Sequence, residues 1–129
     1  MQMNGVRQIE LIASASQSAG TASGTAKPTY EFPASDQHAA YKGHTKRGRL
    51  IHMVSTIGTG TQYGILQGRV PGTDGTQAYH WYRILTTDLL SANGANAPVI
   101  VDHIPPIVRG QLVTATGAVV GELHLEISS

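Results

Sequence analysis

The stretch Ala97–Ile127, APVIVDHIPPIVRGQLVTATGAVVGELHLEI, decides the fold of this chain. Turn-forming residues, Pro105-Pro106 and Thr116-Gly117, divide it into three apolar runs. The last run alternates, with one side formed by Val119, Gly121, Leu123, Leu125 and Ile127 and the other by Val120, Glu122, His124 and Glu126. A period of two is typical of a strand with one face buried and one face in water. We therefore expect this run to anchor a β-sheet core.

The rest of the chain also favours strands. Strands are predicted at Val6–Ile12, Arg49–Thr56, Thr61–Val70, Ala78–Thr86, Ala97–Asp102 and Ile107–Ala115. A short helix is expected at Asp88–Ala92, capped by Asp88 and ended by Asn93-Gly94. The pattern predicts an all-β protein, a β-sandwich of jelly-roll-like type with about seven to eight strands, in a single domain spanning 1–129.

Residues 13–29 form a low-complexity segment, in which Ala13–Ala26 (ASASQSAGTASGTA) contains only Ala, Ser, Gly, Thr and Gln. Such a stretch offers little to bury and is a flexible linker when alone. Two alternatives remain for the folded protein. The segment is either an extended N-terminal arm lying on neighbouring subunits or a flat strand inside its own sheet.

Composition limits the classes of function. The formal charge of +1 argues against a protein whose whole surface binds nucleic acid. Only 13% of residues are charged, against about 25% in an ordinary soluble domain, which favours a surface covered by partners. The absence of cysteine excludes disulfides. We expect no signal peptide and no membrane span, because no apolar run is long enough for either.

One cluster of basic residues stands out, namely Lys42, Lys46, Arg47 and Arg49 in the stretch KGHTKRGR. It either contacts an acidic partner or is a solvated loop beside a strand end. Aromatic residues are not interleaved with these cations, so an acidic protein surface is preferred over nucleic acid.

The first predicted strand is a second candidate for partner binding. Arg7, Ile9 and Leu11 lie on one face, and Ile12 lies on the other. Because both faces carry apolar residues, the strand is either covered on both sides or paired with another chain. Ile9 and Leu11 are therefore candidate partner-binding residues.

No catalytic, metal or cofactor motif is found. A cupin-type metal site needs His-x-His on one strand, and the nearest match is His124-Leu125-Glu126. The other histidines, such as His52 and His80, are expected to be neutral surface or rim residues. The sequence also lacks GxSxG and HExxH motifs. We expect no enzyme activity, no cofactor and no metal.

A resemblance covers residues 55–129. The run GTGTQYGILQGRVPGTDGTQAYHWYRILTTDLL and the closing strands resemble small structural proteins of tailed bacteriophages, which pair a "GTGT…LQG…DGT" hairpin with a Pro-bounded strand and a closing Thr-Gly hairpin. The matching positions are Gly58–Gly68, Asp74–Thr76, Pro105–Leu112 and Thr116–Ile127. These are turn and strand patterns rather than a catalytic signature.

The resemblance implies a capsid decoration (cement) protein. Such a protein is made in the host cytoplasm, forms a trimer and binds the major capsid protein on the outside of the virion. The alternative is a tail, head–tail connector or adhesion protein with a carbohydrate-binding sandwich, for which Tyr79–Tyr82 would supply the aromatic platform. An RNA-phage coat is set aside, because such coats end in helices and this chain ends in predicted strands.

Overall fold

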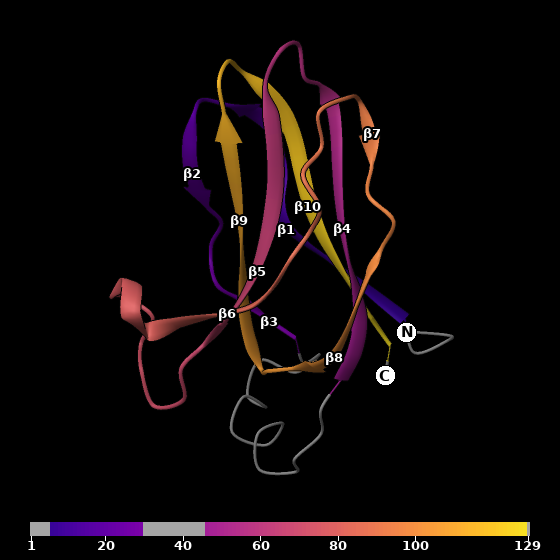
Figure 1. Ribbon diagram of the computed structural model, residues 1–129. Helices are drawn as coiled ribbons and strands as arrows, with labels where there is room; N and C mark the ends of the chain where they lie inside the picture. The colour runs from indigo at the N-terminus through magenta and orange to yellow at the C-terminus, as the bar shows by residue number, and fades with distance from the viewer. Residues whose placement is uncertain (1–5, 30–45, 129) are drawn as a thin grey trace.

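Strand β10 (Val119–Ser128) lies in the middle of a sheet, as the alternation predicts. It pairs antiparallel with β1 (Val6–Gln17) on one side and with β4 (Lys46–Thr56) on the other in the computed structural model, which describes residues 6–29 and 46–128 (Figure 1). The predicted inward set, from Val119 to Ile127 at every second residue, is buried throughout. The prediction for this strand is confirmed.

The strands form two antiparallel sheets. Sheet A has the order β1-β10-β4, with the short strands β7 (Gly94–Ala95) and β8 (Val99–Ile104) both paired to β4. In sheet B, β9 (Ile107–Ala115) and β5 (Thr61–Arg69) are central, and β6 (Trp81–Thr86) pairs with β5. The strands β2 (Gly20–Ser23) and β3 (Lys27–Pro28) both pair with β9.

This strand order is that of a jelly roll. The short strands β2 and β3 lie in succession along β9, and β7 and β8 lie in succession along β4. When each couple is counted as one strand, the ten strands of the described residues become eight, in the orders 1-8-3-6 and 2-7-4-5. A hairpin rolled on itself gives this order, in which the first strand pairs with the last. The predicted all-β, jelly-roll-like sandwich is confirmed.

The two sheets pack on an apolar core. Its buried members come from both layers: Ile9, Leu11, Leu50, Leu66, Val101, Ile104, Val108, Leu112, Leu123, Leu125 and Ile127. Gly110 is required at its position, because an added Cβ would lie 2.8 Å from the side chains of both Leu11 and Leu123. The core therefore holds β1, β9 and β10 in close contact.

A buried polar bridge crosses the core. His52 Nε2 on β4 donates to Gln62 Oε1 on β5 at 2.8 Å, and Gln62 Nε2 donates to Thr114 Oγ1 on β9 at 2.9 Å. Gly121 makes room for the bridge, because a Cβ there would lie 1.8 Å from Gln62 Oε1. His52 Nδ1 is buried and has no hydrogen-bond partner among the residues that the structure describes. Burial lowers the pKa of His52, although the hydrogen bond to Gln62 acts in the opposite direction.

The low-complexity segment is built into the sandwich. Ala13–Gln17 continue β1 along β10, and β2 pairs with β9. The Gly24 N–H then donates to Gly110 O at 2.8 Å. Of the two alternatives, the structure shows strands inside the protein's own sheets, so an arm lying on neighbouring subunits is wrong for these residues. The small side chains allow this close approach, since a Cβ at Gly24 would lie 2.3 Å from Leu11 O.

The helix predicted at Asp88–Ala92 is wrong. Leu90 instead forms a β-bridge with Gln62, in which each N–H donates to the other residue's carbonyl, at 2.9 and 3.1 Å. These bonds extend the edge of sheet B beyond β6. Within the described part of the chain, no helix has the length and apolar character needed to cross a membrane.

Candidate interaction surface

The described part of the basic cluster lies at the start of β4. Arg47 and Arg49 are exposed, whereas Gly48 between them is buried. Lys46 begins the strand, and Lys42 lies outside the described residues. The alternation of strand β4 thus directs the two arginine side chains to the outer face of sheet A.

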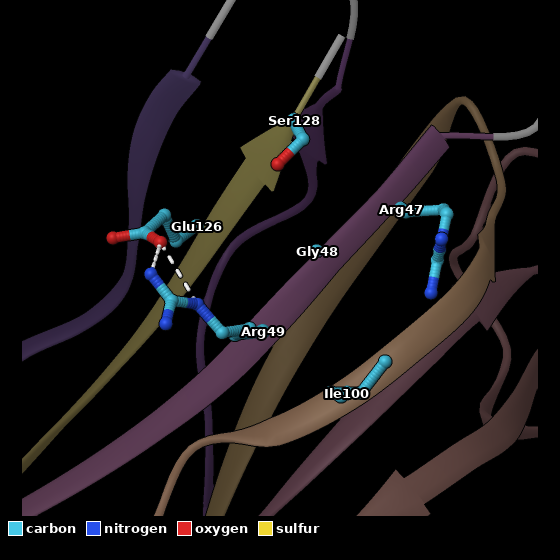
Figure 2. Close-up of a pocket in the computed structure, with 6 residues that line it drawn as sticks. All are labelled: Arg47, Gly48, Arg49, Ile100, Glu126 and Ser128. Carbon is cyan, nitrogen blue, oxygen red and sulfur yellow. Dashed lines mark hydrogen bonds and ion pairs between the residues drawn. The ribbon is translucent and has the colours of Figure 1, made fainter.

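Both arginines have carboxylate partners. Arg49 Nε donates to Glu126 Oε1 on β10 at 3.0 Å, and Arg47 Nε lies 3.2 Å from Asp102 Oδ1 on β8. Figure 2 shows the side chains leaving β4 in opposite directions, Arg49 toward Glu126 and Arg47 toward β8. The side chains of Arg47 and Asp102 are 71% and 65% exposed, so this pair is weak and easily exchanged for another partner.

A shallow hollow of about 290 Å³ lies between these two ion pairs. It is lined by Arg47, Gly48, Arg49, Ile100, Glu126 and Ser128, from strands β4, β8 and β10 (Figure 2). Ile100 is an apolar side chain with 63% exposure, placed beside the arginines. An exposed apolar centre inside a polar, charge-paired rim is the arrangement found in protein–protein contacts. This hollow is our candidate interaction surface.

Ile9 and Leu11 occupy a different place. Both are buried in the core, with 7% and 2% exposure, and neither is among the residues that line the hollow. In this folded state they present no surface to a partner. Sheet B covers the face of β1 that carries Ile9 and Leu11, whereas Gln8 and Glu10 on the other face are exposed, so the first alternative, a strand covered on both sides, is wrong.

The histidines do not gather into a metal site. No group of three or more His, Cys, Asp or Glu side chains in the described ranges is placed to hold a metal ion. The surface or rim role predicted for His52 is wrong, and so is the water-facing position predicted for His124, because both side chains are buried. His124 Nε2 lies 3.2 Å from Glu122 Oε2 on the outer face of sheet A. That face of β10 is therefore less open to water than its polar residues predict.

The aromatic strand does not present Trp81 to a ligand. Trp81 is 8% exposed, its Nε1 donates to Gly75 O at 2.9 Å, and the Arg109 guanidinium lies 4.5 Å from its ring centroid. The carbohydrate platform predicted from Tyr79–Tyr82 needs an exposed Trp81. Because Trp81 is buried, its ring cannot form part of such a platform. Burial also lowers the pKa of Arg109, which stays a cation at any physiological pH.

Sequence reasoning missed an exposed aromatic residue, Tyr79. The continuous strand predicted over Ala78–Thr86 placed Tyr79 on the same face as Trp81. A short 3-10 turn at Ala78–His80 instead precedes β6 and leaves Tyr79 76% exposed. The turn signal at Pro71–Gly75 was visible in the sequence. Nothing in the sequence alone showed that this turn region extends as far as His80.

Comparisons with known proteins do not assign this chain to a family. No family model matches the sequence, and no curated protein matches it. Among solved structures, a chain in the structure of infectious bursal disease virus, Gx strain, aligns with a TM-score of 0.43 and 10% sequence identity. The alignment covers 95% of this chain and 31% of that chain. A likeness at this level establishes no common family.

Proposed function

We propose that this chain is a non-enzymatic virion protein that binds the outside of a tailed-phage capsid and stabilises it as a decoration (cement) protein. The observation that carries the proposal is the jelly-roll strand order of the two sheets. Jelly rolls serve mainly as viral capsid domains, lectins and cupins. A fold alone supports a function only by analogy. The choice among capsid protein, lectin and cupin therefore depends on the individual residues.

The residues favour the virion class. The sequence has no His-x-His pair of the kind that binds metal in cupins. Trp81 is buried, so it cannot serve as the aromatic contact of a lectin. The resemblance of residues 55–129 to small tailed-phage structural proteins then narrows the class to capsid decoration. The partner in this proposal is the major capsid protein, the location is the capsid surface, and the assembly is a trimer.

The physical character of the chain suits this role. A decoration protein holds a shell by wide contacts and performs no chemistry, so it needs a stiff framework and a surface of low charge. The core joins both sheets, and charged residues make up 13% of the sequence. A wide contact of low charge loses little free energy to the desolvation of ions.

The test is the position of the chain in virions. Particles from a host that expresses the gene are purified, and their proteins are identified by mass spectrometry. Cryo-electron microscopy of these particles is expected to show jelly-roll density on the outer surface of the head. Particles made without the chain should keep the same shell but release their DNA at a lower temperature. Absence of the chain from purified heads, or density confined to the tail, rejects the proposal.

A further inference from the structure

The strands of sheet B contain arginines but no acidic residue. No aspartate or glutamate occurs in β2, β3, β5, β6 or β9, whereas the strands of sheet A hold Glu10, Asp102, Glu122 and Glu126. Arg69, Arg83 and Arg109 lie on β5, β6 and β9. These arginines therefore have no carboxylate partner in the strands of their own sheet, unlike Arg47 and Arg49. Arg69 has an interaction elsewhere, and the inference rests on the other two.

The register of sheet B places Arg109 and Arg83 on either side of Gln67. Gln67 on β5 lies opposite Arg109 on β9 and opposite Arg83 on β6. Residues directly opposite each other in antiparallel strands direct their side chains to the same face. That face is the outer one, because the preceding residue of β5, Leu66, belongs to the core. Neighbouring strands are about 4.8 Å apart, so the two arginine Cα atoms are roughly 10 Å apart, and both side chains can reach one ligand above Gln67.

Two contacts hold Arg109 in place. Its Nε donates to Gln67 Oε1 at 2.7 Å, and its guanidinium lies 4.5 Å from the centroid of the Trp81 ring, which is buried. Neither contact is a hydrogen bond from the two terminal Nη groups. The bond also orients the Gln67 amide, because Oε1 accepts and Nε2 is left to donate. A guanidinium that is already positioned loses little entropy when it binds a ligand.

Arg83 completes a group of hydrogen-bond donors. Its side chain is exposed, and it has no hydrogen bond or ion pair with any residue in the described ranges. The Arg83 guanidinium, the Nη groups of Arg109 and Nε2 of Gln67 all donate, and none of these groups accepts. Two positive charges among donors alone favour an anion, and a planar guanidinium matches the two oxygens of a carboxylate.

The rest of the outer face favours a protein as the source of this carboxylate. Tyr63, Ile107 and Val113 are half-buried on it, and the outward positions of β5, β6 and β9 hold no lysine, aspartate or glutamate. Arginine and aromatic side chains among apolar ones are typical of the centre of a protein–protein contact. Nucleic acid is disfavoured, because the Trp81 ring is buried against Arg109 and cannot stack on a base.

We propose that the outer face of sheet B is a second interaction surface, on which Arg83 and Arg109 bind a carboxylate of an acidic protein segment above Gln67. This surface is separate from the hollow on sheet A. The strands β5 and β9 lie in one layer of the sandwich, and β4, which carries the arginines of the hollow, lies in the other (Figure 1). The inference deepens the proposed function and rests on it only for the partner, an acidic region of the major capsid protein.

The first experiment titrates the full chain with a hexaglutamate peptide at low ionic strength. Calorimetry gives the affinity, and the fluorescence of Trp81, the single tryptophan, reports binding beside Arg109. Arg83→Gln and Arg109→Lys are each expected to weaken binding on the order of tenfold, the second because lysine keeps the charge but lacks the planar fork. Lys27→Gln is the matched control. It also removes one positive charge from sheet B, but Lys27 lies opposite the core residue Val108 and not on the outer face.

A further variant tests the site without removing a cation. Gln67→Glu has nearly the same shape and places a carboxylate of the chain itself between the two arginines. It is expected to abolish peptide binding, while urea denaturation shows a stability equal to that of the wild type or higher, because the internal carboxylate occupies the donors. If this variant is destabilised, Arg83→Gln decides the question, since Arg83 is exposed and unchanged circular dichroism is expected to confirm its fold.

Several results overturn the inference: no binding of hexaglutamate, a stable Gln67→Glu variant that binds as the wild type does, or an effect of Lys27→Gln as large as that of Arg83→Gln. Tighter binding of an oligodeoxythymidylate of the same charge also overturns it and points to nucleic acid. None of these measurements involves a capsid. A protein that binds the peptide as described but is missing from virions rejects the proposed function and leaves the surface standing. A chain found on heads that does not bind the peptide does the reverse.

Discussion

Acidification is expected to destabilise the fold through His52. In the folded state His52 Nε2 donates a hydrogen bond to Gln62 Oε1, and the buried Nδ1 has no partner within residues 6–29 and 46–128. Protonation would place a second N–H and a positive charge in the core beside Gln62, Thr114 and Leu123, none of which is charged. A buried charge without a counter-ion is disfavoured, which is why burial lowers the pKa of His52.

The direction and the size of the change in stability follow from the lowered pKa of His52. The ordinary pKa of a histidine side chain is 6.5, and the pKa of His52 in the folded protein lies below it. As the pH falls through 6.5, the unfolded chain takes up a proton at His52 and the folded chain does not, so stability decreases. The largest possible loss is that of a ring that stays neutral in the folded state, which is about 1.4 kcal/mol at pH 5.5 relative to pH 8.

Urea denaturation between pH 8 and pH 5.5 measures this loss. The single tryptophan, Trp81, is buried, so its fluorescence reports unfolding. Because the chain has six histidines, the comparison is with His52→Gln, which keeps a polar group and removes the titration of this one position. The variant is expected to lose less stability than the wild type over this range, by at most about 1.4 kcal/mol. Equal pH dependence in the two proteins would refute the assignment of the effect to His52.

Three further predictions concern stability, each measured as the free energy of unfolding in urea. Gly121→Ala places a Cβ 1.8 Å from Gln62 Oε1 and is expected to cost about 1–3 kcal/mol, and a neutral result would mean that the polar bridge can move aside. Leu123→Ala, at a fully buried position, is expected to cost about 2–5 kcal/mol, and a cost below ~1 kcal/mol would contradict its central place in the core. Arg49→Ala removes the exposed pair with Glu126 and is expected to change stability by less than about 1 kcal/mol, with any effect decreasing in high salt. A larger cost that does not depend on salt would assign Arg49 a packing role instead.

The final strands were predictable because one local pattern determined them. Residues 119–127 alternate with the single exception of Val120, and a shift of one residue would move Val119, Leu123, Leu125 and Ile127 to the wet face. The predicted number of seven to eight strands also corresponds to the eight strands of the jelly roll. By contrast, Asp88–Ala92 has a capping signal for a helix, and two hydrogen bonds between Leu90 and Gln62 override it. Local propensity is a weak signal when a neighbouring strand offers backbone partners.

The candidate surface was only partly predictable, because its partners are distant in sequence. The basic cluster was evident, but Glu126 lies 77 residues after Arg49, and no local pattern connects them. The same holds for Arg47 and Asp102, which meet only because β8 pairs with β4. The exposure of Tyr79 depends on a 3-10 turn that interrupts a stretch with the composition of a strand. In each case tertiary pairing decides what the side chain faces.

The pairing of the first strand with the last also has a consequence for synthesis. In the register of β1 and β10, Val6 lies opposite Ser128, so 122 residues have to be made before this pair can form. At roughly 5–20 residues per second, the ribosome needs on the order of 6–24 s to cover that distance. During this time Ile9 and Leu11 lack the strand that buries them in the folded protein. The apolar residues of β1 therefore stay without this partner strand until β10 has been made, and chaperones have this interval in which to bind them.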